Sequence, residues 1–217
     1  MQSFLSVLEL SWGLLLRGLL LTIAVSAAAV LAGAIIGTII GPILTYGGRI
    51  ASLPFRVFVD VVRGTPVLVL ILATYYMPSA LSISLGPIEA GIVALSVFCA
   101  SHVGETLRGA LIAIPPTQID AARSIGLTFP KMLFFVLLPQ AIRQIAPNFV
   151  NTAVEIVKAS SLLSAIGVGE LLLTTQEIVG RTFMTMEFYA LAGALYLVVN
   201  LTIGAGGWWV ERRFRAQ

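Results

Sequence analysis

The segment GAIIGTIIG, residues 33–41, places three glycines four positions apart in an otherwise apolar run. On a helix these positions share one face, and glycine lets a second helix approach closely. The segment lies within residues 18–48, which contain no charged side chain. As a helix that run is about 46 Å long, more than the hydrocarbon core of a bilayer and far more than the apolar part of a signal peptide. We therefore expect a retained first membrane helix whose glycines pack within the chain rather than against a second copy.

The composition of the whole chain is that of an integral membrane protein. Hydrophobic residues make up 58% and charged residues 11% of 217 residues, against about 45–50% and 25% in globular proteins. The net charge is +3, without the clustered basic and aromatic residues that nucleic-acid binding needs. The single cysteine, Cys99, and the single histidine, His102, exclude an internal disulfide and a zinc site. We expect both to be packing residues, and we expect no metal.

Hydropathy divides the chain into five membrane spans. We therefore expect an all-α integral membrane fold, formed as a single transmembrane domain over residues 1–217. A long, polar and proline-containing segment separates the third span from the fourth. The predicted spans are residues 18–44, 55–77, 88–112, 149–173 and 188–210, and the connecting segment is residues 113–147.

The charge distribution predicts the orientation of these spans. Five spans place the two termini on opposite sides of the membrane. Most cations fall on one side: in residues 49–56, in residues 113–147, and in Arg212, Arg213 and Arg215. The other side carries only Arg17 and Arg181. Because cytoplasmic loops are enriched in Lys and Arg, we expect the N-terminus outside and the C-terminus in the cytoplasm.

The segment DAARSIGLTFPKMLFFVLLP, residues 120–139, breaks the apolar pattern in the middle of the chain. Thr117 and Asp120 fit the [ST]-x-x-[DE] capping pattern, and Pro116 suits a first helical turn. Gly126 suits the left-handed position that ends a helix. These signals predict a short helix that closes at Gly126.

A second short helix is expected after Thr128, with Pro130 in its first turn and an end before Pro139. The expected apolar face of this helix contains Leu133, Phe134, Val136 and Leu137. The helix pair can be a docking surface for another protein, with Asp120 and Arg123 at its rim. It can equally be an amphipathic hairpin packed on its own bundle, and the residues alone favour neither interpretation.

Charged residues within the spans are costly unless they are paired or functional. Glu155 and Lys158 share a helix face. They can neutralise each other, or they can contact the ammonium and carboxylate groups of a zwitterionic substrate. From the residues alone, we favour the ion pair for the two together. Asp60 with Arg63 and Glu105 with Arg108 lie near the cytoplasmic ends of their spans, where gating or structural pairing is expected.

Several motifs, in order, resemble those of one transporter family. DAARSIG, followed after a spacer by LPQA, looks like the EAA loop of binding-protein-dependent ABC importers. The segment ETLRGALIAIPPTQIDAARSIG, residues 105–126, is similar to the polar amino-acid (histidine/glutamine/arginine-type) permeases in particular. So are RGTPVLVLI with the following Tyr75 and Tyr76, and Asn151 with the downstream KASSLLSAIGVGEL. The resemblance extends from about residue 55 to residue 173.

This resemblance implies the type I ABC importer permease fold, in which the loop docks on a separate ATPase subunit and transmits its movements to the membrane helices. The implied ATPase-coupling residues are Asp120, Ala121, Ala122, Arg123, Gly126 and Pro139. The implied substrate path follows the fourth span, with Asn151, Glu155 and Lys158. Three positions depart from the family pattern: Asp120 replaces Glu, Thr117 replaces Gly, and His102 replaces Tyr.

The resemblance also implies partners and a substrate class. The partners are an ATPase that holds ATP and Mg²⁺, a periplasmic or lipid-anchored solute-binding protein, and a second permease, as a homodimer or heterodimer. The chain has no G-x-x-x-x-G-K-[ST] motif, so no cofactor of its own is expected. The expected function is import of a polar amino acid or similar small zwitterion across the bacterial inner membrane.

Two other functions suit a membrane chain of this kind. A stand-alone channel or secondary carrier needs no docking helix pair, and no internal repeat is evident in the sequence. An intramembrane enzyme needs a nucleophile with a base, or paired carboxylates at membrane depth. One histidine and one cysteine offer little for such chemistry.

Overall fold

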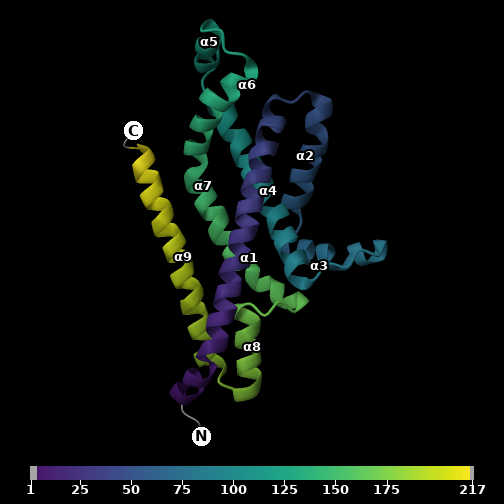
Figure 1. The fold of residues 1–217 in the computed structure, drawn as a ribbon, viewed down its shortest axis with the longest axis vertical. Helices are drawn as coiled ribbons and strands as arrows, with labels where there is room; N and C mark the ends of the chain where they lie inside the picture. The colour runs from purple at the N-terminus through teal and green to yellow at the C-terminus, as the bar shows by residue number, and fades with distance from the viewer. Residues whose placement is uncertain (1–3, 216–217) are drawn as a thin grey trace.

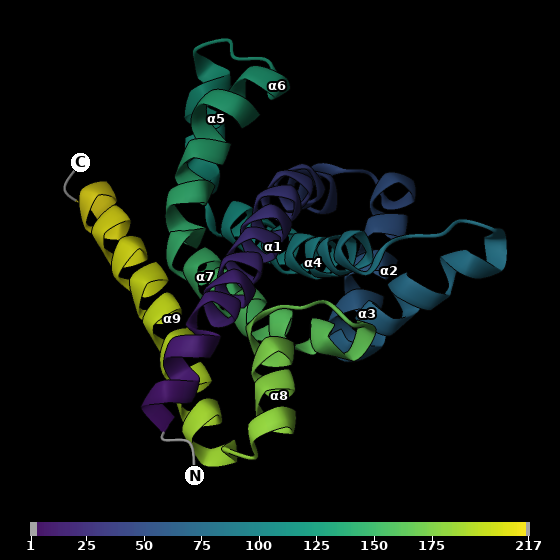
Figure 2. The ribbon, with the colours of Figure 1, turned by 60° about the horizontal axis from the view of Figure 1, so that its bottom comes forward.

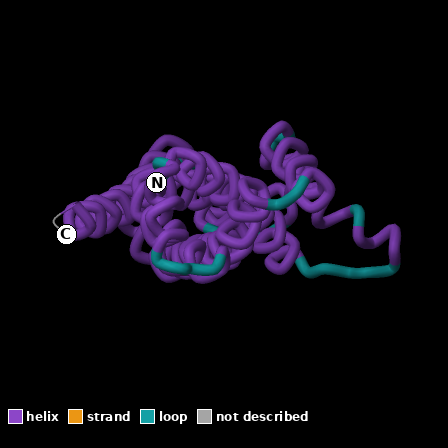
Figure 3. The backbone as a smooth tube through the Cα atoms, turned by 90° about the horizontal axis from the view of Figure 1, so that it is seen from above, coloured by secondary structure: helices purple, strands orange, loops and turns teal. Residues whose placement is uncertain are grey.

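A computed structural model describes residues 4–215, apart from the side chains of residues 210, 211 and 213–215. The predicted cytoplasmic cations Arg213 and Arg215 therefore lie outside the described side chains. The described residues are almost entirely helical and contain no strand (Figure 3). The elements are α1 (Phe4–Tyr46), α2 (Arg49–Gly64), α3 (Val67–Tyr76), η1 (Pro78–Leu81), α4 (Pro87–Ala113), α5 (Pro116–Ser124), α6 (Phe129–Met132), η2 (Leu133–Leu137), α7 (Leu138–Ala159), η3 (Ser160–Ile166), α8 (Leu171–Thr182) and α9 (Thr185–Arg215).

The close packing of α1 on α4 forms the centre of the fold. Gly33 of α1 faces Cys99, Gly37 faces Val103, and Gly41 faces Leu107. The partner numbers rise together, so the two helices run parallel. A Cβ atom at Gly37 would lie 2.7 Å from the Val103 Cβ and 2.9 Å from the Ala100 carbonyl oxygen, distances that real side chains do not reach. This confirms the prediction that these glycines pack within the chain.

Among the described residues, four single helical segments are long and apolar enough to cross a membrane, namely Phe4–Tyr46, Pro87–Ala113, Phe129–Ile166 and Thr185–Trp209. A fifth crossing requires α2 and α3 to be counted together. The all-α fold class is therefore confirmed, whereas several span boundaries are not. The first helix begins at Phe4 rather than at residue 18, because Glu9 and Arg17 are accommodated within it.

The predicted second span, residues 55–77, is not one continuous helix. α2 and the segment Val67–Leu81 meet at 112°. Proline disfavours helical geometry at the preceding residue, and Thr65 is indeed extended, with φ −102° and ψ 133°. Pro66 continues the extended turn before α3 begins. The expectation that a helix continues through this Thr-Pro step is therefore wrong.

The predicted fourth span, residues 149–173, is displaced along the chain. The helical segment begins at Phe129 and ends at Ile166, where Gly167 adopts a left-handed φ of +83°. Pro139 and Pro147 both lie inside this segment without ending it. The segment 113–147 is therefore not all connection, because its second half forms the first turns of a membrane-length helix.

The chain ends lie at opposite ends of the molecule. Figures 1 and 2 show α5, α6 and the C-terminal end of α9 at one end, and the N-terminus with α8 at the other. In both views α9 leans away from α1 towards its C-terminal end, whereas α3 and η1 project sideways. We refer below to the α5–α6 end and the α8 end.

A buried carboxylate joins three helices near the α8 end. Glu170 is fully buried and caps α8, because its carboxylate oxygens accept hydrogen bonds of 2.9 Å from the Leu172 and Leu173 amides. Its Oε2 also accepts a 2.6 Å hydrogen bond from the Tyr196 hydroxyl of α9. The adjacent Leu171 amide donates to the Thr22 hydroxyl of α1 at 3.1 Å. Burial raises the pKa of the Glu170 carboxyl, although all three donors act in the opposite direction.

We expect Gly37→Leu to lower the free energy of unfolding by about 1–3 kcal/mol or more, because the new side chain overlaps Val103 and the Ala100 backbone. The measurement is thermal unfolding of the purified chain in detergent. Gly13→Leu is the matched control, because Gly13 lies on the same helix with nothing within 4 Å of its Cβ position. Equal losses in the two variants would contradict the packing argument.

Glu170 should make stability depend on pH. Since burial raises its folded-state pKa above the value of about 4.3 in an unfolded chain, the unfolded chain releases this proton first as the pH rises. The stability contributed by Glu170 is therefore complete below pH 4.3 and is lost as the pH passes through the folded pKa. As the pH rises through this range, the unfolding temperature of the wild-type chain should fall relative to that of Glu170→Gln. Parallel pH profiles for the two proteins would contradict the assignment.

Candidate functional site

The start of α5 has the predicted proline but lacks the predicted side-chain cap. Pro116 occupies the first turn, as expected. The residue before the helix is Pro115, and no side chain caps the helix. Thr117 therefore lies inside the first turn rather than at the cap, so the predicted capping box with Asp120 is wrong. The two consecutive prolines place the helix start earlier than the Thr-x-x-Asp pattern indicates.

Gly126 closes α5 in the predicted left-handed conformation, with φ +77°. Its amide donates to the Arg123 carbonyl at 2.9 Å, and the Leu127 amide donates to the Ala122 carbonyl at 3.1 Å. These bonds satisfy carbonyl groups that the end of the helix leaves free. No atom lies within 4 Å of the Cβ position of Gly126, so only its backbone conformation requires glycine.

The predicted coupling residues of α5 divide into an exposed and a buried group. Asp120, Ala121, Arg123 and Gly126 are exposed, and the Asp120 carboxylate lies 3.9 Å from the Arg123 guanidinium. Ala122, in contrast, is only 4% exposed. It packs in a core cluster with residues of α4, α6, η2 and α7, among them Leu107, Leu111, Met132, Leu137 and Ala141. Ala122 is therefore not available to a partner.

The second helix of the pair does not stop before Pro139. Residues Leu133–Leu137 form a π-helical turn, in which the Leu138 amide donates to the Leu133 carbonyl. Pro139 follows in the first turn of α7. At this position the missing amide proton interrupts no regular α-helical hydrogen bond. The apolar face that was expected for the second helix is also divided, since Leu137 is buried and Phe134 is 64% exposed. The hairpin thus continues directly into a membrane-length helix.

The α5–α6 hairpin is also attached to the end of α1. The Phe129 ring of α6 meets the Tyr46 ring edge-on, with 5.3 Å between their centroids. Together with the cluster around Ala122, this contact connects the hairpin to α1, α4 and α7. Displacement of the hairpin must therefore move three membrane helices or break these contacts.

Three polar side chains share one face of α7. Asn151, Glu155 and Lys158 are spaced four and three residues apart, and all three are exposed. Among the described residues, neither Glu155 nor Lys158 has a hydrogen-bond or ion-pair partner. The structure therefore does not contain the ion pair that the sequence analysis favoured for these two residues.

A small charged cavity of about 80 Å³ lies between α1, α2 and α4, at the end of α1 near the α5–α6 hairpin. Within it Glu105 and Arg108 form a two-pronged ion pair, with distances of 2.6 and 2.8 Å. Asp60 also lines the cavity but, although both residues are described, forms no ion pair with Arg63. Arg56 of α2 completes the lining. Arg56 was not among the expected site residues, although its spacing of four from Asp60 places both side chains on one face of the helix.

The remaining reactive side chains are held locally. The His102 Nδ1 lies 3.0 Å from the Phe98 carbonyl oxygen and 3.3 Å from the Ser101 hydroxyl, and its ring packs on Phe98. Cys99 is fully buried. Among the residues that the structure describes, no group of three or more His, Cys, Asp or Glu side chains could hold a metal ion.

Comparison with known proteins places this geometry in a family. Residues 33–216 match the family model "Binding-protein-dependent transport system inner membrane component". The glutamine transport system permease protein GlnP of Escherichia coli (strain K12) is 30% identical over 204 residues, covering 93% of each chain. The arginine transport system permease protein ArtQ of Bacillus subtilis (strain 168) is 31% identical over 207 residues, again covering 93% of each chain.

Solved structures agree with this assignment. A chain from the crystal structure of an amino acid ABC transporter with histidines is 30% identical and superposes with a TM-score of 0.88, over 98% of this chain and 99% of that one. A chain of the MetNI methionine ABC transporter in an inward-facing conformation shares the fold, with a TM-score of 0.81, 24% identity, and coverage of 92% and 95% of the two chains. The protein thus belongs to the family of inner-membrane components of binding-protein-dependent transport systems, as a permease subunit whose ATPase is a separate component.

Proposed function

We propose that this chain is the permease subunit of an ABC importer that carries a polar amino acid or similar small zwitterion into the cytoplasm. The relatives named for glutamine and arginine transport support this substrate class. The observation that carries the proposal is the α5–α6 hairpin, a turn-closed helix pair at one end of a chain of this family. A stand-alone channel or an intramembrane enzyme has no use for such a hairpin.

In this proposal the ATPase binds the exposed surface of the hairpin and is the subunit that holds ATP and Mg²⁺. Asp120, Ala121, Arg123 and Gly126 form the contact surface, since all are exposed at the end of the molecule. Ala122 has a different role from the one implied by its position in the motif. It anchors α5 to the cluster that contains Leu107 of α4, and so passes movement from the ATPase to the membrane helices.

Pro139 extends this mechanical connection into α7. It is exposed and follows the π-helical turn, at the point where the hairpin becomes the membrane-length helix. A π-helical turn holds one residue more than a regular α-helical turn, and such turns occur often at functional positions. We infer that this turn is where α7 bends when the hairpin is displaced.

The polar face of α7 is the proposed substrate path. Lys158 suits the carboxylate of an amino acid, and Glu155 suits its ammonium group. Neither residue has a partner in the described part of the chain, so each is available to a substrate. Asn151 extends the same face by one turn with a group that can both donate and accept. Unpaired charges at this depth also require a polar environment rather than lipid.

A second permease subunit follows from the same face. The exposed Glu155 and Lys158 side chains must be shielded from lipid chains, and none of the described elements covers them. We infer that another copy, or a homologous permease, faces α7 so that the path lies between the two subunits. The charged cavity around Glu105 and Arg108 would then act as a gating element, because it connects the broken span α2–α3 to α4, which carries the hairpin.

We propose that the α5–α6 end lies in the cytoplasm and the α8 end faces outward. The hairpin must meet a cytoplasmic ATPase, and the distribution of Lys and Arg favours the same orientation. The outward end carries a groove of about 640 Å³ between the first turns of α1 and the later turns of α8, with Glu177 and Arg181 in its lining. Its mixed polarity suits a solute-binding protein that attaches transiently.

The backbone of Gly126 provides the test of the coupling proposal. Gly126→Val should abolish most substrate-stimulated ATP hydrolysis and uptake, because a β-branched residue is strongly disfavoured at φ +77°. Gly126→Asn should retain most of both, since asparagine tolerates this conformation. The assay uses the complete transporter in vesicles with its ATPase and loaded binding protein.

The control is Gly109→Val, at a helical glycine with open space at its Cβ position. It should leave coupling intact. Retention of coupling in Gly126→Val, or equal loss in the asparagine variant, would remove the support for this docking geometry.

The substrate path has a separate test. Glu155→Ala should lower uptake roughly tenfold, which corresponds to the loss of about 1.4 kcal/mol of substrate interaction. Assembly with the ATPase, measured by co-purification, should not change. Glu187→Ala removes an exposed carboxylate of α9 as a control. Loss of the assembled complex in the Glu155 variant would assign that residue a structural role instead.

A further inference from the structure

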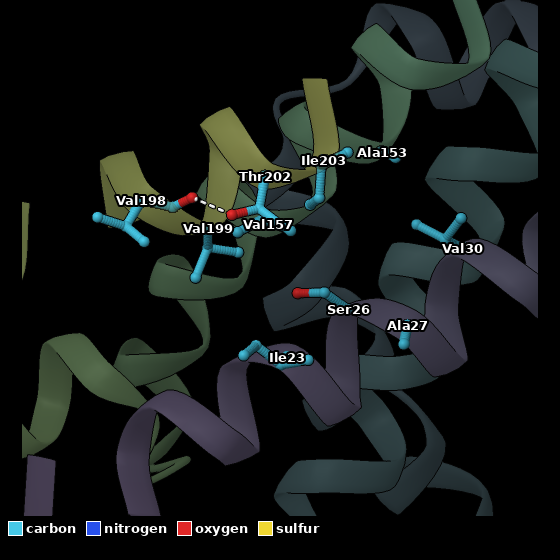
Figure 4. Close-up of a pocket in the computed structure, with 10 residues that line it drawn as sticks. All are labelled: Ile23, Ser26, Ala27, Val30, Ala153, Val157, Val198, Val199, Thr202 and Ile203. Atoms are coloured by element: carbon cyan, nitrogen blue, oxygen red, sulfur yellow. Dashed lines mark hydrogen bonds between the residues drawn. The ribbon is translucent and has the colours of Figure 1, made fainter. Parts of the chain in front are cut away.

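A cavity of about 440 Å³ lies between α1, α7 and α9, away from the coupling hairpin and the charged cavity. Figure 4 shows side chains from the three helices converging on it. Its lining is apolar apart from two hydroxyl groups, those of Ser26 and Thr202. The apolar lining includes Ile23, Ala27, Ala153, Val157 and Val198.

The two hydroxyl groups cannot hold water in a space of this size. The Thr202 hydroxyl already donates a 2.8 Å hydrogen bond to the Val198 carbonyl. Ser26 is 2% exposed, and within the described residues its hydroxyl has no hydrogen-bond partner. Figure 4 shows this oxygen pointing into the cavity. Since a buried water needs two to four polar partners, the lining favours an apolar occupant.

The cavity lies between membrane-length helices and is partly open to its surroundings. All three helices that line it belong to membrane-length segments. Two of its residues remain open to the surroundings, because Ile23 is 42% and Val198 is 61% exposed. The gap exists because α9 leans away from α1, as Figures 1 and 2 show. Ser26 lies near the middle of α1, so the cavity is at the depth of lipid chains rather than of headgroups.

The cavity and the polar face of α7 lie on opposite sides of that helix. With about 100° of rotation per residue, Ala153 and Val157 point to one side, whereas Glu155 and Lys158 point roughly 150° away. A second subunit that covers the charged face therefore does not cover the cavity. This arrangement favours lipid over a second copy of the chain as the occupant.

We propose that the cavity between α1, α7 and α9 binds an acyl chain of a bilayer phospholipid. The chain fills the space that the divergence of α9 leaves and is held by contacts with apolar side chains of all three helices. Ser26 and Thr202 supply the two hydroxyl groups of the wall. The site is independent of the coupling hairpin, so uptake and ATP hydrolysis do not enter its test.

The test uses the full chain in vesicles of phosphatidylethanolamine and phosphatidylglycerol. A small fraction of phosphatidylcholine carries a photoactivatable diazirine at the middle of one acyl chain. After irradiation, adducts are located by mass spectrometry. We expect adducts at Ile23, Ala27 and Val198 to exceed those at Ile35 and Ile39, which are exposed on the same helix α1 outside the cavity.

Two filling variants and one control make the test specific. Ala27→Phe and Ala153→Phe place a ring in the cavity and should lower the adducts there several-fold. Ala24→Phe is the matched control, because Ala24 is also exposed on α1 but does not line the cavity. Size-exclusion chromatography establishes that each variant is folded. Two filling variants from different helices keep the test valid if one fails to fold.

Two outcomes would overturn the proposal. The first is an even distribution of adducts over exposed positions, or equal effects of Ala24→Phe and Ala27→Phe. The second is the formation of disulfide-linked dimers by Thr202→Cys in a Cys99→Ala chain, where residue 202 carries the sole thiol. Such dimers would assign the cavity to a second copy of the chain.

Discussion

Three glycines of α1 allow its backbone to lie directly against α4, and the positions of the other elements depend on this contact. Gly33, Gly37 and Gly41 face Cys99, Val103 and Leu107 in parallel register. In a bilayer, exclusion of water does not drive helices together, so association relies on close packing. The glycine face supplies this packing over two turns of both helices. It also sets the position of the hairpin relative to α4. Leu107 of α4 contacts Gly41 of α1 and, with Leu111, belongs to the core cluster beneath α5.

The hairpin is consequently a rigid extension of the bundle rather than a flexible loop. Ala122 points inward to α4 and α7, and Phe129 meets Tyr46 at the end of α1. The left-handed turn at Gly126 sets the angle between its two helices. A partner that displaces α5 therefore acts on α1, α4 and α7 together. In the proposed function, this property lets the permease subunit respond to movement of a separate ATPase.

The sequence predicted features that depend on local chemistry. The glycine spacing indicated close packing, Gly126 indicated a left-handed turn, and Pro116 marked a helix start, all of which the structure contains. Errors arose where neighbouring residues compete. Pro115 displaced the expected cap at Thr117, and Thr65 with Pro66 broke a run whose hydropathy is uniform. Pro139 was expected to end a helix, but the π-helical turn before it allows the helix to continue.

Side-chain partners were less accessible to sequence reasoning, because they depend on tertiary packing. Spacing places Glu155 and Lys158 on one face but cannot show whether they meet, and in the structure they do not. The same spacing correctly paired Glu105 with Arg108. Ala121 and Ala122 are adjacent residues of the same type, yet Ala122 is buried and Ala121 is exposed. Glu170 gave only a weak signal, as a carboxylate directly before an apolar run.

Helix α7 carries two different surfaces, one charged and one apolar, which lie on opposite sides of the helix. One side of this helix carries Glu155 and Lys158, whose side chains have no partner among the described residues and which only a polar environment can accommodate. The opposite side, with Ala153 and Val157, borders an apolar cavity at the depth of lipid chains. If one side of α7 lines the proposed substrate path and the other side meets lipid, the helix lies at the boundary between a subunit interface and the bilayer. In the proposed function, this position lets a chain with few spans enclose a path, because another subunit would supply the opposite wall.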